Sequence, residues 1–192
     1  LVLGRVPETV GKIRTRSLDD RRMSRREYIR LRWNIKIQRN QLLKTYAALS
    51  QDVDLKKPYI YVTLQYQPEQ STNPQGGAFQ HQDLMVDLIS NSVPSDWNVY
   101  VKEHVAALLS HSQFERSRTP EFYEKLAALP NVTLVKPETN PFDFIDGAKA
   151  VATISGSSGW EAVLRGRPAF LFGYSWYRGC EGVFETRSKE NL

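Results

Sequence analysis

The sequence is poor in the residues that build disulfides, metal centres and membrane spans. It has one cysteine, Cys180, which excludes an internal disulfide framework and any cysteine-rich zinc site. It holds no run of about 18 apolar residues, so it predicts no transmembrane helix, and no signal peptide is visible. No Asp-x-Asp pair stands at the end of a predicted strand, so the pattern does not indicate a divalent-metal clamp. The sequence therefore predicts neither a metal site nor a cofactor.

The 192 residues have the composition of a folded globular protein. Hydrophobic residues make up 41% of the chain and aromatic residues 11%, which is not the composition of a disordered chain. The length allows one sizeable core, or one domain with an appendage. Because the first residue is Leu1 and not Met, we expect a segment of a longer protein. The final residues, 188–192, fit the remnant of an expression tag and are left out of the predicted fold.

Charge divides the chain into two predicted parts. Residues 1–57 carry 15 Lys or Arg against 6 Asp or Glu, a net charge of +9. Residues 58–192 carry 11 against 15, a net charge of −4. We therefore expect a basic linker and helix over 1–57, attached to a mildly acidic folded domain over 58–187.

Two periodicities compete within the basic part. Apolar residues from 29 to 37 alternate as in a strand, whereas a longer set falls on one face of a helix. The residues of that helical face include Tyr28, Leu31, Ile35 and Leu42. We predict a helix from about Ser24 to Leu49 that presents an exposed apolar face at the boundary with a missing domain.

The basic residues of this segment leave several partners open. The arginines from Arg14 to Arg39 suit nucleic acid, anionic lipid or an acidic glycan. Alternatively, they form only a solvated helix face. The acidic body argues against nucleic acid, because a nucleic-acid-binding protein should spread basic residues over its folded surface.

The clearest folding unit is the stretch from 150 to 173. Residues 150–154 form a short apolar run typical of a buried strand. Small residues at 155–159 break that strand, helix formers follow from Trp160, and a second apolar run spans 169–172. The pattern predicts strand, small-residue turn, helix and strand, which is a compact βαβ unit.

Strand and helix signals alternate throughout the chain after Pro58. Five strands are predicted, near 59–64, 97–102, 132–135, 150–154 and 168–172. Such alternation is typical of an α/β fold with three layers, in which a parallel sheet lies between helices on both faces. We expect the strand order 3-2-1-4-5, with the first and fourth strands adjacent at the switch point.

Polar residues follow three of these strands, at the edge where open α/β sheets bind ligands. They are the segment 65–67, His104, and the serines Ser155, Ser157 and Ser158. A helix that starts near Ser157 has free N–H groups and a partial positive charge, so this turn suits phosphate. Small-residue turns of this kind also occur in α/β proteins that bind no phosphate.

Two residues at this edge have competing interpretations. His104 can donate to a phosphate oxygen or act as an acid, or it is a loop histidine bonded to backbone. Glu161 either accepts hydrogen bonds from a ribose or closes a capping box with Ser157 or Ser158.

Four segments between Pro58 and Phe184 resemble the bacterial capsular polysaccharide biosynthesis proteins, including the β-Kdo transferases of capsule assembly. They are Gln65-Tyr66-Gln67-Pro68-Glu69, Tyr100-Val101-Lys102-Glu103-His104, the stretch 152–162, and 166–173 with 182–184. Together, in this order, they are more specific than any one segment. The resemblance implies a Rossmann-like domain, the nucleotide-binding C-terminal half of a GT-B glycosyltransferase whose N-terminal half is missing here.

The resemblance also implies roles for individual residues. His104 matches a histidine that contacts the donor phosphate, and it is assigned the catalytic role. The residues implied to bind substrate are Gln67, Lys102, Ser155, Ser157, Ser158 and Glu161. Two positions depart from the family: Val105 stands where proline is usual, and Gln65 where relatives often have histidine. The second departure leaves the identity of the donor open.

The implied activity is metal-independent transfer from a nucleotide sugar, expected to be a CMP-sugar such as CMP-Kdo, to a glycan or glycolipid acceptor. Such a protein would be cytoplasmic, with peripheral contact at the inner face of the membrane, and would not bind nucleic acid. Two other interpretations stay open. One is a non-catalytic module that binds nucleic acid or anionic membrane through the basic segment. The other is a scaffold domain that kept the fold and lost the activity.

Overall fold

A computed structural model describes residues 24–67, 69, 71–109 and 118–186. The chain divides into two compact units, Leu1–Trp33 and Asn34–Leu192, and each is described by itself. Several predicted features lie outside the described residues: the part of the basic segment before Ser24, Pro68 of the segment 65–69 that carries the resemblance, and the tag remnant at 188–192.

The described part of the first unit is the beginning of α1 (Arg25–Leu49). Ser24 and Glu27 cap it reciprocally: the Glu27 N–H donates to Ser24 Oγ at 3.3 Å, and the Ser24 N–H donates to the Glu27 carboxylate at 2.8 Å. Two backbone donors at the helix start are thereby satisfied. The hydrogen bonds that the Ser24 N–H and the Ser24 hydroxyl donate to the Glu27 carboxylate lower the pKa of Glu27 from its ordinary value. The predicted helix over 24–49 is confirmed, and the strand-like alternation is overridden.

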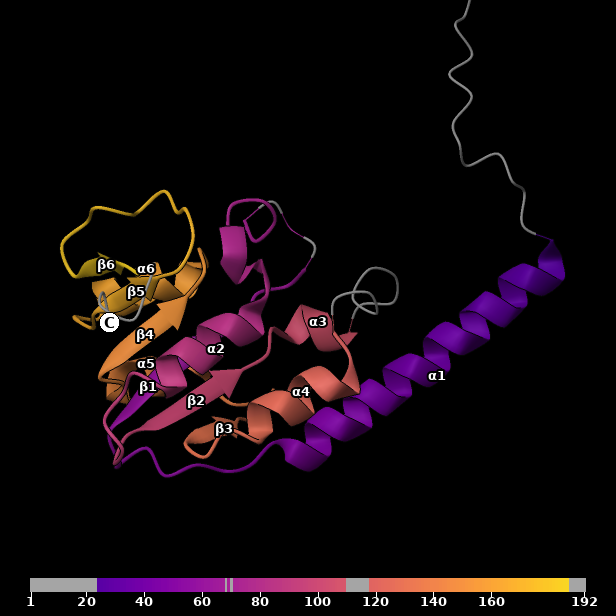
Figure 1. Ribbon diagram of the computed structural model, residues 1–192, viewed down its shortest axis with the longest axis horizontal. Coiled ribbons are helices and arrows are strands. Elements are labelled where there is room, and N and C mark those ends of the chain that lie inside the picture. Colours follow the sequence, from indigo (N-terminus) through magenta and orange to yellow (C-terminus); the bar gives the residue numbers. More distant parts are fainter. Residues whose placement is uncertain (1–23, 68, 70, 110–117, 187–192) are drawn as a thin grey trace, which may run out of the picture. The chain divides into compact units, whose positions relative to one another are not determined.

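The second unit is built around a parallel sheet of six strands (Figure 1). They are β1 (Tyr59–Thr63), β2 (Asn98–Lys102), β3 (Val132–Leu134), β4 (Ala150–Thr153), β5 (Ala169–Leu171) and β6 (Val183–Glu185). Their order is β3-β2-β1-β4-β5-β6, and each pairing is parallel. The predicted order of five strands is confirmed, including the pairing of β1 with β4 at the switch point.

The sheet differs from the prediction by one added strand. β6 pairs with β5 at the edge of the sheet, with Phe184 opposite Phe170. Its three residues follow a glycine-containing loop, and two of them are exposed. So short a run has neither the length nor the burial pattern that identifies a strand in the sequence.

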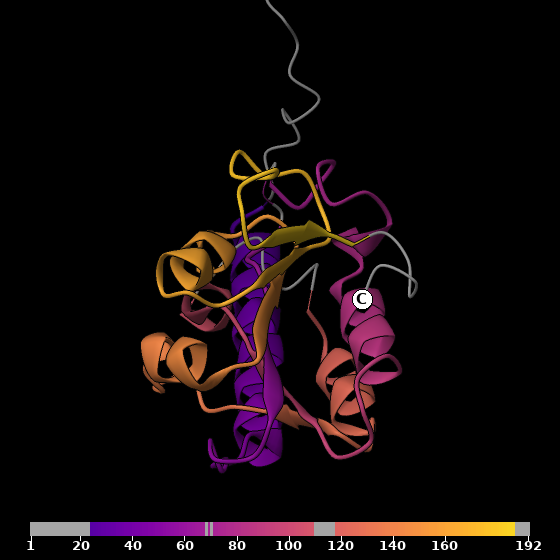
Figure 2. The same cartoon turned by 90° about the vertical axis from the view of Figure 1, so that its left-hand side faces the viewer.

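Helices cover both faces of the sheet and complete three layers (Figure 2). They are the 3-10 helix η1 (Gly77–Gln80), α2 (Gln82–Ser90), α3 (Val105–Leu109), α4 (Pro120–Ala127), α5 (Pro141–Gly147) and α6 (Ser157–Leu164). α2 and α4 lie on one face, and α5 and α6 on the other. Thr119 and Asn140 cap α4 and α5, and each is followed by proline at the first helical position.

The later part of α1 belongs to the hydrophobic core of the second unit. Leu42 is only 3% exposed and Tyr46 only 1%. Both pack in the apolar layer that also holds Val62 of β1 and Met85 of α2. The expectation that Leu42 would be exposed was therefore wrong. The apolar face of α1 was predicted correctly, but at Leu42 and Tyr46 this face packs into the core of the second unit.

The strand order decides where a site can form. β2, β1 and β4 are neighbours and run parallel, so their carboxyl ends share one edge of the sheet. The turns that follow these three strands are therefore adjacent, although they are up to about 90 residues apart in the sequence.

Candidate functional site

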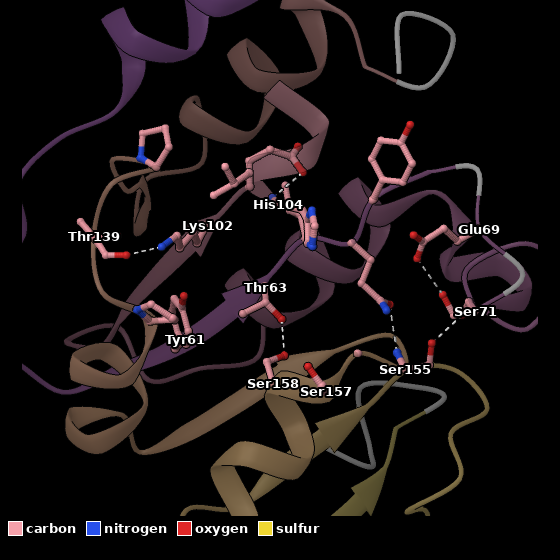
Figure 3. Close-up of a pocket in the computed structure, with 18 residues that line it drawn as sticks. Tyr61, Thr63, Glu69, Ser71, Lys102, His104, Thr139, Ser155, Ser157 and Ser158 are labelled. Atoms are coloured by element: carbon pink, nitrogen blue, oxygen red, sulfur yellow. Dashed lines mark hydrogen bonds between the residues drawn. The ribbon is translucent and has the colours of Figure 1, made fainter. Parts of the chain in front are cut away.

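A cavity of about 630 Å³ lies at this edge of the sheet, where β1, β2 and β4 end (Figure 3). Five of the predicted site residues line it, namely Lys102, His104, Ser155, Ser157 and Ser158. Further lining residues come from the end of β1, the segment that follows it and the loop after β3, and they include Thr63, Ser71 and Thr139. The parallel topology thus brings most of the predicted polar residues to one place.

The start of α6 forms one wall of the cavity. Gly156 occupies the N-cap position, and no side chain of the described residues caps the helix there. The first N–H groups of the eight-residue helix therefore lack side-chain acceptors at the end that carries its partial positive charge. Ser158 is held in place from β1, because its Oγ lies 2.6 Å from Thr63 Oγ1. This wall suits a phosphate group.

Gln65 fastens the turn after β4 to the segment after β1. Its Oε1 accepts from the Ser155 N–H at 3.0 Å, while Ser155 Oγ donates to the Ser71 carbonyl at 2.6 Å. Gly156 must be glycine for this approach, because a Cβ there would lie 2.9 Å from Thr153 Oγ1 and 3.1 Å from Gln65 Nε2. The hydroxyl of Ser155 therefore has a partner within the protein, and its predicted contact with phosphate stays a prediction.

His104 extends its ring into the cavity from the carboxyl end of β2 (Figure 3). Its Nδ1 accepts a hydrogen bond from the Ala106 N–H at 3.2 Å. This pattern assigns the proton of the neutral ring to Nε2, which is then a donor. The two interpretations of His104 are thus compatible: one nitrogen bonds backbone, and the other can serve a ligand.

Lys102 places a buried ammonium beside the same cavity. The residue is 8% exposed, and its Nζ donates to the Thr139 carbonyl. Burial lowers the pKa of Lys102, and the Glu138 carboxylate opposes this effect. A cation whose direct hydrogen-bond partner is a neutral carbonyl gains from an anionic ligand, because a buried charge is costly without a counter-charge.

Two predicted site residues do not line this cavity. Gln67 donates through Nε2 to the Gln80 carbonyl at 2.7 Å and accepts from Arg118 through Oε1 at 2.8 Å. Glu161 accepts from Ser157 Oγ at 3.1 Å, as a pair four residues apart on α6. This pair is not a capping box, since the cap position belongs to Gly156. Contacts of Gln67 and Glu161 with substrate stay predictions.

Sequence reasoning missed a buried ion pair beside the cavity. Arg118 Nε donates to Glu103 Oε2 at 2.7 Å, and both side chains are almost fully buried. No periodicity links these two residues, and Arg118 belongs to none of the motifs considered. The one available signal was the position of Glu103 next to His104.

The described residues contain neither a cluster of metal ligands nor a helix that could span a membrane. Across 24–67, 69, 71–109 and 118–186, no group of three or more His, Cys, Asp or Glu side chains is arranged to hold a metal ion. In the same part of the chain, no helix combines the length and apolarity that crossing a bilayer requires.

A parallel α/β sheet of this order, with a cavity at its carboxyl edge, defines a Rossmann-like domain of the kind that forms each half of a GT-B glycosyltransferase. The chain belongs to the capsule polysaccharide biosynthesis protein family, whose model matches residues 15–191.

Individual relatives agree with this family. The chain is 29% identical over 108 residues to the capsule polysaccharide modification protein LipA of Neisseria meningitidis serogroup B, covering 56% of this chain and 14% of LipA. Its fold is similar to two structures of KpsC from Thermosulfurimonas dismutans. The β-Kdo 2,7 transferase has a TM-score of 0.52 at 15% identity, over 78% of this chain and 45% of that chain. The β-Kdo 2,4 transferase has a TM-score of 0.51 at 14% identity, over 84% and 50%. The chain thus spans about half the length of these structures.

Proposed function

We propose that this chain is the donor-binding part of a glycosyltransferase in capsular or surface polysaccharide synthesis. The observation that carries the proposal is the cavity, which unites the uncapped start of α6, the Nε2 donor of His104 and the ammonium of Lys102. Each of these groups favours negative charge. A nucleotide sugar presents such charge at the bond that must break. Membership of the capsule family and the fold shared with the KpsC transferases support this function.

The proposed reaction transfers the sugar from the nucleotide phosphate to an acceptor hydroxyl. As the bond between the sugar carbon and the phosphate oxygen breaks, negative charge develops on the leaving phosphate. N–H groups near Ser157 and the Nε2–H of His104 stabilise this charge, which is where pre-organised donors contribute most to catalysis. We propose that these donors act in place of a metal ion. The base that takes the acceptor proton would come from the other half of the enzyme.

Lys102 supports a donor with a second anionic group. The ammonium lies at the end of β2, whereas the phosphate wall lies at the start of α6, so the cavity offers two separate positive regions. A CMP-activated acid sugar such as CMP-Kdo carries both a phosphate and a sugar carboxylate. We propose this donor class, since a sugar carboxylate would add a second counter-charge to that of Glu138 near the buried ammonium of Lys102, and a neutral sugar would not.

The remaining partners follow from the proposed reaction. The acceptor would be a glycan or glycolipid, bound by a second Rossmann-like half. Synthesis from nucleotide donors would take place in the cytoplasm, with peripheral contact at the membrane. The basic beginning of α1 is one candidate for that contact, because this part of the helix contains Arg25, Arg26, Arg30 and Arg32 together with the aromatic residues Tyr28 and Trp33.

A thermal-shift series tests the proposal directly. CMP, CDP, UDP and GDP are each titrated against the full chain, and CMP is expected to raise the melting temperature most. A ligand at 100 times its Kd stabilises the folded state by about 2.7 kcal/mol, which such an assay resolves. Absence of any shift with all four nucleotides would contradict the proposal. Inorganic phosphate serves as the control for simple anion binding at α6.

A further inference from the structure

We propose that Arg118 and Glu103 are a positioning pair that holds the three turns of the cavity in register. The inference rests on the proposed function for its choice of ligand. Arg118 and Glu103 hold the turns after β1, β2 and β4 in place, whereas the groups proposed to bind the donor face the cavity.

The pair itself is buried and fully engaged. Arg118 Nε and Glu103 Oε2 are 2.7 Å apart, with side chains 2% and 0% exposed. The hydroxyl of Tyr123 donates to the same carboxylate oxygen at 2.8 Å. Burial raises the pKa of Tyr123 and keeps that hydroxyl protonated as a donor. A buried ion pair is tolerated only when its other polar atoms are satisfied, and here they are used to hold neighbouring segments.

The guanidinium reaches from the β2 turn to the β1 turn. Arg118 Nη2 donates to the Gln65 carbonyl at 3.1 Å, and Nη1 donates to Gln67 Oε1 at 2.8 Å. One planar fork therefore engages a carboxylate, a backbone carbonyl and a side-chain amide at once. A lysine at this position would keep the charge but not this geometry.

The connection continues to the third turn. Gln65 Oε1 accepts from the Ser155 N–H at 3.0 Å, directly before the start of α6. An unbroken series thus runs Glu103, Arg118, Gln65, Ser155, across the ends of β2, β1 and β4. These are the turns that carry His104, line the middle of the cavity and form its phosphate wall.

Glu103 also fixes the backbone of the catalytic candidate. Its Oε1 accepts from the His104 N–H at 2.9 Å. The first turn of α3 supplies the Ala106 N–H that donates to His104 Nδ1 at 3.2 Å. The orientation and tautomer of the His104 ring therefore depend on a turn whose backbone is hydrogen-bonded to the Glu103 carboxylate. Loss of the carboxylate charge should release that turn and let both ring tautomers interconvert.

The test uses the full chain in three variants and one control. Arg118→Lys keeps the charge, Glu103→Gln removes it from the partner, and Tyr123→Phe removes one donor while the ion pair remains. Asp146→Asn is the control, because it disrupts the exposed pair of Arg165 with Asp146, whose Arg165 Nη1 and Asp146 Oδ1 are 2.7 Å apart. The chain has three histidines, so the imidazole nitrogen spectra of labelled protein can be resolved, with His104→Gln to assign the signal.

We expect the wild type and Asp146→Asn to show His104 as a single tautomer protonated at Nε2. Arg118→Lys and Glu103→Gln should average the two tautomers and weaken CMP binding by about tenfold or more, at temperatures well below their melting points. A general loss of stability would not move the tautomer signal in a folded protein. Tyr123→Phe should change the tautomer signal and the CMP affinity less than the other two variants do. If Glu103→Gln does not fold, Tyr123→Phe is the variant that tests the role of the Glu103 carboxylate.

Folded variants with an unchanged His104 spectrum and unchanged CMP affinity would overturn the inference and leave the pair a structural one. If the wild type binds no nucleotide, the proposed function fails. The tautomer comparison still decides whether the pair positions His104, so the two failures can be told apart.

Discussion

At the scale of single residues, His104 shows how one side chain can bond the backbone and still face a cavity. Its Nδ1 is engaged by the Ala106 N–H, and its Nε2 is left to the cavity. The sequence presented these as alternatives, because a motif reveals which residue is present but not which nitrogen is used. The local backbone geometry resolves the choice.

Replacing this ring should affect binding but not folding. His104→Ala removes a donor to a charged group, which is worth about 1.5–3 kcal/mol. We therefore expect nucleotide affinity to fall about tenfold or more, with little change in the melting temperature since the residue is exposed. Isothermal titration with CMP measures the first effect. His81→Ala is the matched control, because His81 is also exposed but does not line the cavity; equal losses in both variants would contradict the assignment.

Lys102 predicts a pH dependence with a defined sign. Burial lowers the folded-state pKa of Lys102 below the ordinary value of 10.5, so the folded state binds its proton less tightly than the unfolded state does. The ammonium therefore destabilises the fold below the lowered pKa, and this penalty disappears as the pH rises to about 10.5. Lys102→Met should be at least as stable as the wild type near neutral pH, and its advantage should shrink at alkaline pH.

Thermal melts of both proteins across this pH range test the prediction, and the difference between them cancels other titrations. A Lys102→Met advantage that grows with pH would contradict the sign. Because the variant also removes the proposed counter-charge for a sugar acid, it should weaken binding of an acid-sugar nucleotide more than that of CMP.

Individual side-chain contacts were harder to predict from the sequence than the fold was. The shared location of Lys102, His104 and Ser157 was predictable because each lies at or just after the end of a recognisable strand, and the ends of neighbouring parallel strands meet at one edge of the sheet. Arg118 was not predictable. Its buried guanidinium donates hydrogen bonds to Glu103, Gln65 and Gln67, and no local sequence pattern predicts such contacts between distant residues.

At the scale of elements, α1 was predicted correctly as a helix and wrongly as exposed over its later part. A 3.6-residue pattern identifies an apolar face but does not show where along its length that face is covered. The stripe that begins at Tyr28 continues to Leu42 and Tyr46, and the last two lie in the core. β6 was missed because it has no apolar pattern that marks a strand: its residues are not buried, and it is identified only by its pairing with β5.

Two substitutions on α1 distinguish the covered from the exposed part. Leu42→Ala removes a side chain that is 3% exposed and should destabilise the fold by roughly 2–5 kcal/mol. Ile37→Ala, at 58% exposure, should change stability by less than about 0.5 kcal/mol. Urea unfolding of both variants gives the comparison. A Leu42→Ala variant as stable as Ile37→Ala would show that α1 does not pack in solution as described.

At the scale of the whole molecule, a basic first segment is joined to an acidic folded body. The topology of that body was predictable in full for five strands, because alternating strand and helix signals allow few arrangements once crossovers must be right-handed. Where an acceptor would bind was not predictable, since the chain spans about half the length of the similar structures.

The charge asymmetry predicts that the basic segment and the cavity act separately. Reversing Arg25 and Arg26 to glutamate should leave the CMP-induced thermal shift unchanged, because the cavity lies entirely in the unit from Asn34 onward. The same double variant should weaken any binding to anionic vesicles or polynucleotides and reduce its salt dependence, measured between about 50 and 200 mM salt. Steeply salt-dependent polynucleotide binding that survives the double reversal would favour a nucleic-acid function over the proposed one.

Tyr46 has a practical consequence for anyone choosing where to cut this protein. Its hydroxyl accepts from the Glu103 N–H at 3.2 Å and donates to the Val135 carbonyl at 2.7 Å. Through these two bonds α1 holds the backbone of the turn after β2. The sharp change in composition at Pro58 invites truncation there. A fragment that begins at Pro58 would leave an open slot in its core and free the backbone next to His104. Its failure to bind a nucleotide would then report the missing helix, and would say nothing against the site.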